Sequence, residues 1–475
     1  MKKAAIITAM ALFSVMVASC DLFPDFALKE PNDLGLLPEG SFYAQNIVSK
    51  SFYEVKAERL HEGEKCVIWA EINSGVTKEK AEDIAYEYDT IIRPMIIEKF
   101  GCEFNDGSDI LDYANELADR NDGKLTILLL NIKDEYKKPA DSYVAGYFYP
   151  GDFMPRGKFQ NGYYSNGRDM IYVDTNPGLK DYATQAYATF AHELQHLVNF
   201  VTTVQLRSAL MDTWIDEGLS SQAEHFYLGK HPVDKCAWLI DKRNTINTGN
   251  NFYVWGNHSD KKNAILDDYA TVYLFFRWLY LQANTVTGLQ SSIFREIACS
   301  PHNDHRAVTD VAKRINPATW NNWEGLLRTW LAAYYYPENS YGYTGDTELL
   351  AILKSEKINK IYPNAGKTAS LYPGEGVYSI SNGSTPGQAG NIRYAQLTGD
   401  TQNCLLTFNA NTYNAYKTPN KPNAAPETGS VASSVTVSRT AADNSQAGEW
   451  AGPYVIDAQD LLGRNRDLPI RQLSR

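Results

Sequence analysis

The 475-residue sequence lacks the hallmarks of several protein classes. Its six cysteines form no close pairs, which excludes a dense disulfide scaffold and a zinc site built on paired cysteines. Positive charge is not in excess: 45 basic and 56 acidic residues give a formal net charge of −11, so no nucleic-acid partner is expected. No internal repeat, glycine-rich phosphate loop or Ser/His/Asp arrangement is evident. The composition, 44% hydrophobic and 21% charged, is that of a folded globular protein with two or three domains.

Long hydrophobic runs are missing beyond the N-terminus. After the first twenty residues no stretch reaches 18 apolar residues without a charge, and the best candidate, 271–281, contains Arg277. The N-terminus has two lysines, an apolar run over 4–17 and small residues before Cys20. This pattern resembles a bacterial lipoprotein signal at 1–19, after which Cys20 is lipidated; an ordinary secretory signal is the alternative. We expect an extracytoplasmic protein, lipid-anchored to a bacterial membrane and facing the periplasm or the cell surface.

The hydrophobic pattern predicts an α+β fold that continues into helices. Strands are expected at 66–72, 125–130 and 170–174, and a helix over 77–100 that Pro94 should kink. Further helices are expected at 181–202, 213–228, 264–283, 288–298, 305–314 and 320–335. Short strands are expected near the C-terminus at 377–380, 404–408 and 435–437. The predicted order is a tether (20–55), an α+β part with the motif helix described next (56–204), a helical part (205–345), a linker (346–365) and a small β-rich C-terminal domain (366–475).

The most informative motif is H-E-x-x-H at His192, Glu193 and His196. Apolar residues recur around it with a period of 3.6, which predicts a helix and places the two histidines on one side, one turn apart. That spacing lets both ring nitrogens bind one Zn²⁺ at about 2.0–2.1 Å. Glu193 can reach a water bound to that metal, where a general base must be. A helix that merely carries two surface histidines and a glutamate is the alternative.

A catalytic zinc needs a third protein ligand and an open position. Glu217 is the candidate, because it falls in the first turns of the next predicted helix, twenty residues after His196. Gly218 should let this helix approach the zinc helix closely. Asp216 and Glu224 are alternative ligands, although Glu224 is better placed to orient a ligand histidine. The other interpretation of Glu217 is a solvated helix carboxylate.

The two motif segments, 192–200 and 214–219, together resemble the gluzincin metallopeptidases. The closest group is the hyicolysin family of bacterial endopeptidases, and the resemblance covers about residues 60–340. Its supporting residues lie at 126–130, 145–150, 166–174 and 269–276. The resemblance implies a zincin-like fold with a small mixed sheet, one Zn²⁺ per chain and a polypeptide substrate. Peptide bonds would be hydrolysed by a metal-activated water, with Glu193 taking its proton and delivering it to the leaving amine.

Similarity to the aminopeptidase N and thermolysin families adds a tyrosine to the expected site. In aminopeptidase N relatives a tyrosine on a later helix stabilises the oxyanion; Tyr269 matches best and Tyr273 second, and an ordinary helix aromatic is the alternative. The G-x-M-E-N segment that grips a free amino terminus is absent, which favours internal cleavage. By resemblance, strand 170–174 would border the cleft and pair with an extended substrate. A non-catalytic surface lipoprotein that uses this fold for binding is the alternative function.

Weaker signals carry less weight. Residues 119–123 resemble a calcium loop, but the glycine comes one residue early and the closing acid is missing. His225 is more typical of a core or surface histidine than of a ligand. His302 and His305 have no acidic partner at useful spacing beyond Asp304.

Overall fold

The fold is known from a computed structural model, which describes most of the chain between residues 37 and 437. The described residues are 37–138, 143–158, 163–255, 264–355, 358, 360–361, 371–380, 385–388, 390–397, 403–412 and 434–437. The expected signal sequence and Cys20 lie outside them. Within the described part of the chain, no helix has the length and apolar character needed to cross a bilayer.

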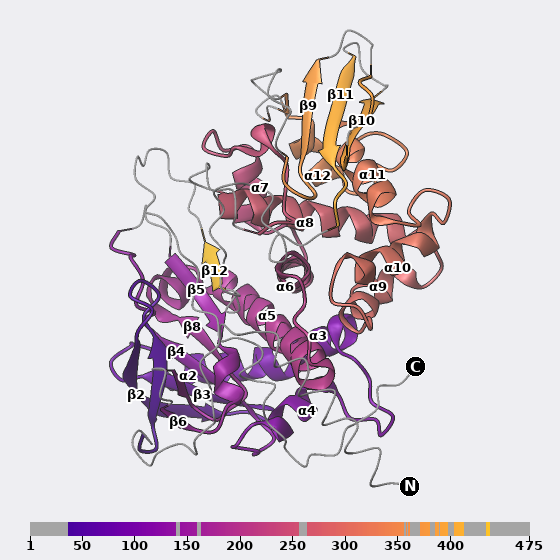
Figure 1. Cartoon of the computed structure of the whole chain (residues 1–475). Helices are drawn as coiled ribbons and strands as arrows, with labels where there is room; N and C mark the ends of the chain where they lie inside the picture. Colours follow the sequence, from indigo (N-terminus) through magenta and orange to yellow (C-terminus); the bar gives the residue numbers. More distant parts are fainter. Residues whose placement is uncertain are drawn as a thin grey trace, which may run out of the picture.

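A seven-stranded mixed sheet forms the N-terminal half of the molecule (Figure 1). Its strand order is β1-β2-β3-β4-β8-β5-β12. The β3–β4 and β4–β8 pairs are parallel and the other pairs are antiparallel. The central strand β4 is buried along its length, which explains its unbroken apolar sequence. The bounds are β1 (Ser41–Gln45), β2 (Phe52–Glu62), β3 (Cys66–Glu71), β4 (Leu125–Leu130), β5 (Tyr143–Phe148), β8 (Met170–Asp174) and β12 (Ser434–Val437).

Regular structure begins earlier than the expected end of the tether at residue 55. Strand β1 is buried along its whole length and pairs with the first half of β2. Asn166, the residue after β7 (Tyr164–Ser165), fixes β1: its Nδ2 donates to the carbonyl oxygen of Tyr43, and its Oδ1 accepts from the Tyr43 N–H. The bonds join residues 123 positions apart, so the local sequence around β1 gives no sign of them.

Strand β8 lies inside the sheet, which corrects the expectation that an extended substrate pairs with it. It pairs with β4 on one side and with β5 on the other, so neither of its edges can accept another strand. The outer edge of β5 is paired in turn with β12. The short strands β6 (Gly157–Lys158) and β7 (Tyr164–Ser165) form a separate two-stranded antiparallel sheet.

The helix expected over 77–100 is divided into three parts. They are α2 (Lys78–Glu87), a π-helical segment η1 (Tyr88–Ile92) and α3 (Arg93–Phe100). Thr77 caps the first part, because its hydroxyl accepts a hydrogen bond from the N–H of Lys80. Pro94 lies in the first turn of α3, where a missing N–H is tolerated. The expected kink at Pro94 therefore corresponds to a change from π-helix to α-helix, which occurs at Arg93, just before the proline. Helix α4 (Ile110–Leu117) follows.

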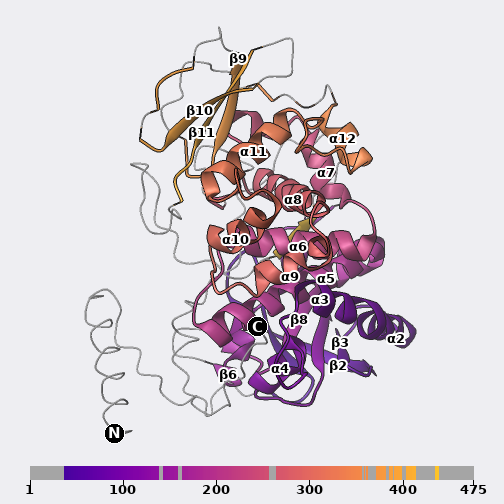
Figure 2. The same cartoon turned by 90° about the vertical axis from the view of Figure 1, so that its right-hand side faces the viewer.

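The helix with the H-E-x-x-H motif, α5 (Ala183–Phe200), packs against β5 and β8 and continues into the π-helical segment η4 (Val201–Gln205). Gly146 of β5 makes this contact close: a Cβ atom there would lie 2.6 Å from Cγ2 of Thr189 and 2.8 Å from the carbonyl oxygen of Tyr172. Helix α6 (Thr213–Leu228) lies between α5 and α8 (Ala264–Ala283), as both views show (Figures 1 and 2).

The helices of the C-terminal half pack around an aromatic core. Trp214 of α6 contacts the rings of Phe275 and Trp323, and Phe275 also contacts Trp330. The helices expected at 213–228, 264–283, 288–298, 305–314 and 320–335 are confirmed, whereas α7 and α12 were not expected. Besides α6 and α8, the bounds are α7 (Val233–Leu239), α9 (Leu289–Ala298), α10 (His305–Ile315), α11 (Trp323–Tyr335) and α12 (Thr347–Leu353). A mixed sheet followed by helices agrees with the expected α+β class.

A three-stranded antiparallel sheet, in the order β10-β11-β9, lies at the end of the molecule far from the large sheet (Figures 1 and 2). It packs on α11, where the hydroxyl of Tyr378 donates to the carbonyl oxygen of Leu331. The bounds are β9 (Gly376–Ile380), β10 (Ile392–Leu397) and β11 (Cys404–Asn409). The third strand expected in the C-terminal region forms instead as β12 in the large sheet, because it pairs with β5.

One disulfide joins the two halves of the chain. Cys102, just after α3, is bonded to Cys299, just after α9, with a sequence separation of 197. Cys66, Cys236 and Cys404 are buried. The cysteine spacing alone could not give this pairing.

Candidate metal centre

Helices α5 and α6 bring three potential metal ligands together. His192 and His196 lie one turn apart on α5, and their ring centroids are 4.6 Å apart. Glu217 comes from the second turn of α6. All three side chains are buried, with exposed fractions of 0%, 2% and 2%. The packing of α6 on α5 therefore makes a compact His-His-Glu cluster from two segments of the sequence.

The ligand atoms of this cluster converge on one point. The Oε2 atom of Glu217 lies 3.6 Å from Nε2 of His192 and 3.8 Å from Nε2 of His196. None of these three buried atoms has a hydrogen-bond partner. Two donors at 2.0–2.1 Å from one tetrahedral ion would lie about 3.3–3.4 Å apart, close to the observed spacing. In the described part of the chain, no other three His, Cys, Asp or Glu side chains bring ligand atoms within 4.8 Å of one another.

The arrangement fits a zinc ion better than it fits an empty protein core. Buried polar atoms are normally hydrogen-bonded, and leaving one without a partner costs about 1–3 kcal/mol. Two imidazole nitrogens and one carboxylate are a donor set that Zn²⁺ prefers, and three protein ligands leave a fourth position open. The calcium-like segment 119–123 forms no comparable group of ligand atoms.

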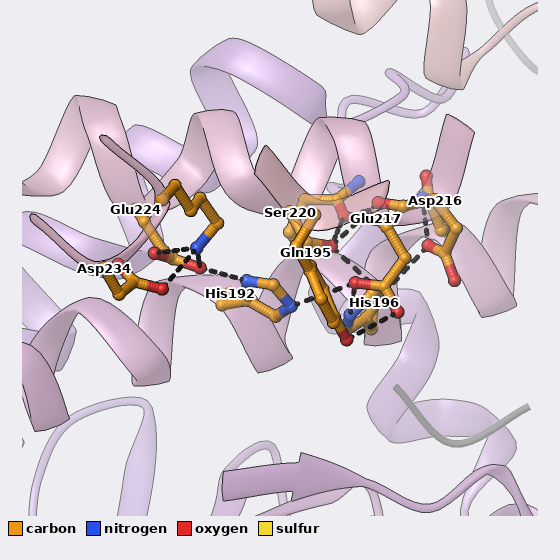
Figure 3. Close-up of polar contacts among 11 residues, drawn as sticks. His192, Gln195, His196, Asp216, Glu217, Ser220, Glu224 and Asp234 are labelled. Atoms are coloured by element: carbon orange, nitrogen blue, oxygen red, sulfur yellow. Dashed lines mark hydrogen bonds and ion pairs between the residues drawn. The ribbon is translucent and has the colours of Figure 1, made fainter. Parts of the chain in front are cut away.

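The second nitrogen of His192 is held by Glu224. Its Nδ1 lies 2.5 Å from Oε1 of Glu224, on the side of the ring away from Glu217 (Figure 3). The Nζ of Lys235, from α7, donates to both carboxylate oxygens of Glu224 at 2.8 and 2.7 Å. Burial opposes the charge on Lys235, but Asp234 and Glu224 outweigh it and raise the pKa of its ammonium group. Glu224 thus lies where an orienting residue was expected.

Asp216 lies behind His196, away from the point of convergence. Its Oδ1 is 3.0 Å from Nδ1 of His196, and it also accepts a hydrogen bond from Nδ2 of Asn199. The hydroxyl of Ser220 lies 3.0 Å from the same nitrogen. Burial opposes a charged ring, but the carboxylates of Asp216 and Glu217 raise the pKa of His196 to about 9. Of the three acidic candidates for the third ligand, only Glu217 reaches the cluster.

The environment of His192 has the opposite effect. Its ring is completely buried, and this burial lowers its pKa to about 3, although Glu217 acts in the other direction. A neutral imidazole is the form that can offer a lone pair to a metal. The two histidines of the cluster therefore lie in electrostatically different surroundings.

Glu193 lies on the side of α5 that faces the sheet. It follows His192 on α5 and is completely buried. A Cβ atom at Gly146 of β5 would be 3.4 Å from the Cγ of Glu193, which shows that β5 passes alongside this side chain. Since β5 has a glycine here, Glu193 has room between the strand and the His-His-Glu cluster.

Only one of the two candidate tyrosines faces the cluster. The hydroxyl of Tyr269 on α8 donates to Oε1 of Glu217 at 3.3 Å, and its ring packs edge-on against Trp255. Burial, reinforced by Glu217 and Glu193, raises the pKa of Tyr269 well above 10, so the hydroxyl keeps its proton. Tyr273, one turn further on, instead bonds to Nδ1 of His225.

That second tyrosine belongs to a separate polar group. Its hydroxyl lies 3.0 Å from Nδ1 of His225 and also contacts Nδ1 of His231. Nε2 of His231 lies 3.0 Å from Oδ1 of Asp346, on the N-terminal side of α12. His225 is thus a buried core histidine, in line with its sequence context.

Gly218 was expected to let α6 approach α5 closely, and this prediction is wrong, because the glycine faces α8 instead. A Cβ atom at this position would lie 2.2 and 2.3 Å from ring carbons of Phe276 on α8. The glycine therefore permits the close approach of α6 to α8, on the side away from the zinc helix. Because successive helical residues point about 100° apart, the neighbour of an inward-facing Glu217 faces a different helix.

Three further side chains lie around the cluster and were not predicted from the sequence: Lys235, Ser220 and Asn199. For Lys235 a signal was available: it precedes Trp238 and Leu239 by three and four residues, which places it on the apolar face of α7. A lysine on a buried helix face needs a buried anion nearby.

Comparison with known proteins gives one informative relative. No protein-family model matches the chain. The chain is 30% identical over 285 residues to a neutral metalloprotease, ShpI, of Staphylococcus hyicus. The alignment covers 58% of this chain and 58% of that protein, so the chain spans less than two thirds of the relative's length. The similarity supports a relationship to metallopeptidases, and a cluster able to hold a metal is present in the structure.

Proposed function

We propose that this chain is a zinc-dependent endopeptidase of the gluzincin type with a zincin-like fold. The observation that carries the proposal is the convergence of Nε2 of His192, Nε2 of His196 and Oε2 of Glu217, three buried atoms without hydrogen-bond partners. The similarity to a neutral metalloprotease supports it. The motif segments 192–200 and 214–219 favour the hyicolysin family within the gluzincins. The substrate would be a polypeptide cleaved internally.

The metal would be held by these three side chains, one ion per chain. When bound, zinc supplies a Lewis acid that polarises a water molecule and the scissile carbonyl group. The chain's own contribution begins with orientation: Glu224 holds His192 and Asp216 holds His196, so that both rings direct Nε2 to the same point. The three side chains are buried, and the low local dielectric strengthens the electrostatic interactions among them.

Proton transfer is assigned to Glu193. It adjoins His192 on α5 and lies between the metal ligands and β5, so its carboxylate can take a proton from the attacking water and deliver it to the leaving amine. Tyr269 is assigned to the oxyanion. Its hydroxyl lies beside Glu217 and keeps its proton, so it can donate a hydrogen bond to the negative oxygen of the tetrahedral intermediate.

The direct test is Glu193→Gln, with Glu82→Gln on the exposed face of α2 as the matched control. We expect the Glu193 variant to bind one zinc per chain, as measured by elemental analysis, and to hydrolyse an unfolded protein substrate about 10²–10⁴ times more slowly. His196→Ala and Glu217→Ala should both lose zinc. Wild-type hydrolysis by Glu193→Gln, or full zinc content in Glu217→Ala, would contradict the proposal.

A non-catalytic binding protein with the same fold is less well supported. Such a protein needs no general base, yet Glu193 is retained and buried beside the cluster. It would also show no difference between the Glu193 and Glu82 variants in any hydrolysis assay. The experiment above therefore separates the two functions.

For location we propose a lipid anchor at Cys20 and an extracytoplasmic site at a bacterial membrane. The disulfide between Cys102 and Cys299 supports an oxidising compartment, because such bonds are rare in the cytosol. Cys20→Ala should move the protein from the membrane fraction to the soluble fraction and abolish incorporation of a labelled fatty acid. Retention of the label in that variant would contradict the anchor.

A further inference from the structure

We propose that Lys235 is a positioning residue of the metal centre: it anchors the Glu224 carboxylate so that His192 presents Nε2, and not Nδ1, to the ion. The inference rests on the proposed zinc site. It concerns a residue on α7, a helix that contributes no ligand and lies in the part of the chain after both motif segments.

The first argument is the fixed position of Lys235. Helix α7 is attached to α8 by the indole of Trp238, whose Nε1 donates to Oδ1 of Asp267 at 2.8 Å. On the same face of α7, Lys235 is only 3% exposed, and its Nζ lies within hydrogen-bond distance of both oxygens of Glu224. The second carboxylate near it, Asp234, is at 3.6 Å. The hydrogen bonds of the ammonium group thus go to the two carboxylate oxygens of Glu224.

The second argument concerns which ring nitrogen of His192 carries the proton. A carboxylate that accepts hydrogen bonds on both oxygens from an ammonium group carries no proton and can only accept. Oε1 of Glu224 lies 2.5 Å from Nδ1 of His192, so that nitrogen must be the donor. A neutral imidazole has a single N–H, which leaves Nε2 with a bare lone pair. This Nε2 is one of the three atoms that converge at the candidate metal position.

The third argument is the cost of removing the cation. Glu224 is 5% exposed and His192 is fully buried, so water cannot replace the ammonium group. Without it, the buried carboxylate of Glu224 lies beside His192 with no compensating charge. Breaking a buried pair by deleting one partner is strongly unfavourable, because the remaining charge is uncompensated. The carboxylate would then no longer be fixed in the position that orients His192 (Figure 3).

His196 does not share this arrangement. Its Nδ1 contacts Asp216 and Ser220 at 3.0 Å each, and the Asp216 side chain is 17% exposed. A partly exposed carboxylate is stabilised by water and does not require a buried cation. Dependence on a lysine is therefore specific to the His192 side of the cluster.

The experiment uses the full chain and zinc alone as the ligand. Four proteins are compared with the wild type: Lys235→Met, Glu224→Gln, the double variant, and Lys230→Met as a control on an exposed lysine just after α6. Zinc affinity is measured by competition with a chromogenic chelator. We expect Lys235→Met to weaken zinc binding about 10–100-fold, the usual effect of losing a residue that orients a metal ligand, and Lys230→Met to leave it unchanged.

The double variant separates positioning from packing. In the Glu224→Gln background the carboxylate is already gone, so Lys235→Met should cause no further loss of zinc affinity. A role of Lys235 in packing alone would give equal losses in both backgrounds and would overturn the proposal. If Lys235→Met does not fold, the comparison of Glu224→Gln with the double variant still decides between the two.

The tautomer of His192 gives a readout that stability does not affect. In zinc-free wild-type protein, nitrogen chemical shifts of selectively labelled histidine should show the proton on Nδ1. In Lys235→Met the form with the proton on Nε2 should become populated. An unchanged tautomer together with unchanged zinc affinity would refute the role of Lys235 alone. A wild-type protein that binds no zinc would refute the proposed function itself.

Discussion

The substitution Gly218→Ala tests how closely α6 must approach α8 for the metal centre to form. The new Cβ atom would lie 2.2 Å from the nearest ring carbon of Phe276, whereas ordinary contact begins at 3.4 Å, so the helix or the ring must move by about 1.2 Å. The ring has little freedom, because Phe276 is fully buried and contacts the rings of Trp214 and Phe294.

The expected loss of stability follows from two opposing effects. Overpacking of a buried site costs about 1–3 kcal/mol, and the upper end applies because three carbons of the Phe276 ring lie within 3.0 Å of the new atom. Alanine is favoured over glycine inside a helix by about 1 kcal/mol. The free energy of unfolding should therefore fall by about 2 kcal/mol, as measured by urea denaturation of zinc-free protein.

The same displacement should reach the ligands. Glu217 precedes Gly218 on α6, and its Oε2 is only 3.6–3.8 Å from the two histidine nitrogens. A shift of about 1 Å at this point removes the carboxylate from the spacing that one ion requires. We expect zinc affinity to fall at least tenfold in the chelator competition assay.

Phe276→Leu provides the matched background, since it removes the ring that Gly218→Ala would strike. In that background the alanine substitution should be neutral or stabilising and should leave zinc affinity unchanged. If Gly218→Ala lowers neither stability nor zinc affinity in the wild-type background, the close contact between α6 and α8 does not position Glu217.

Three further predictions follow from other parts of the molecule. Replacing Cys102 and Cys299 by serine should lower the free energy of unfolding by about 5 kcal/mol, the loop-closure value for a separation of 197 residues, and unchanged urea denaturation would contradict it. Tyr269→Phe should lower kcat about 10²-fold without unfolding the protein. Tyr273→Phe should keep kcat and lower the free energy of unfolding by about 1–3 kcal/mol, because Nδ1 of the buried His225 loses its partner. Burial raises the pKa of Asp152 to about 7, so its contribution to stability is complete below pH 4 and is lost as the pH rises to 7. At about 1.4 kcal/mol for each pH unit this amounts to up to about 4 kcal/mol, and Asp152→Asn should flatten that part of the pH–stability curve; parallel curves would refute it.

The sequence was sufficient where the determining contacts are local. His192 and His196 share one helix, so a four-residue spacing alone fixes their rings on one side. The helix boundaries near 213, 228, 264 and 283 also follow from local apolar periodicity. Glu217 could be predicted as the third ligand because the sequence indicates where its helix begins. The start of the helix in turn determines the turn of the helix in which Glu217 lies.

Contacts between distant segments could not be predicted in this way. Strand β1 depends on Asn166, and the disulfide depends on the packing of α9 against α3. The neighbour that Gly218 faces depends on which side of α6 is covered by α5 and which by α8. Lys235 is recognisable as a buried lysine, but its partner Glu224 is defined only once α7 is folded against α8.

The bond between Cys102 and Cys299 encloses His192, His196 and Glu217 in one covalent ring of the chain. A single cut of the backbone anywhere inside that ring opens it without releasing a fragment. A molecule nicked there would migrate as one species on a non-reducing gel and separate into two bands only after reduction. For a protein proposed to hydrolyse peptide bonds, self-cleavage in this region would therefore leave the ligand-bearing helices tethered to the rest of the chain.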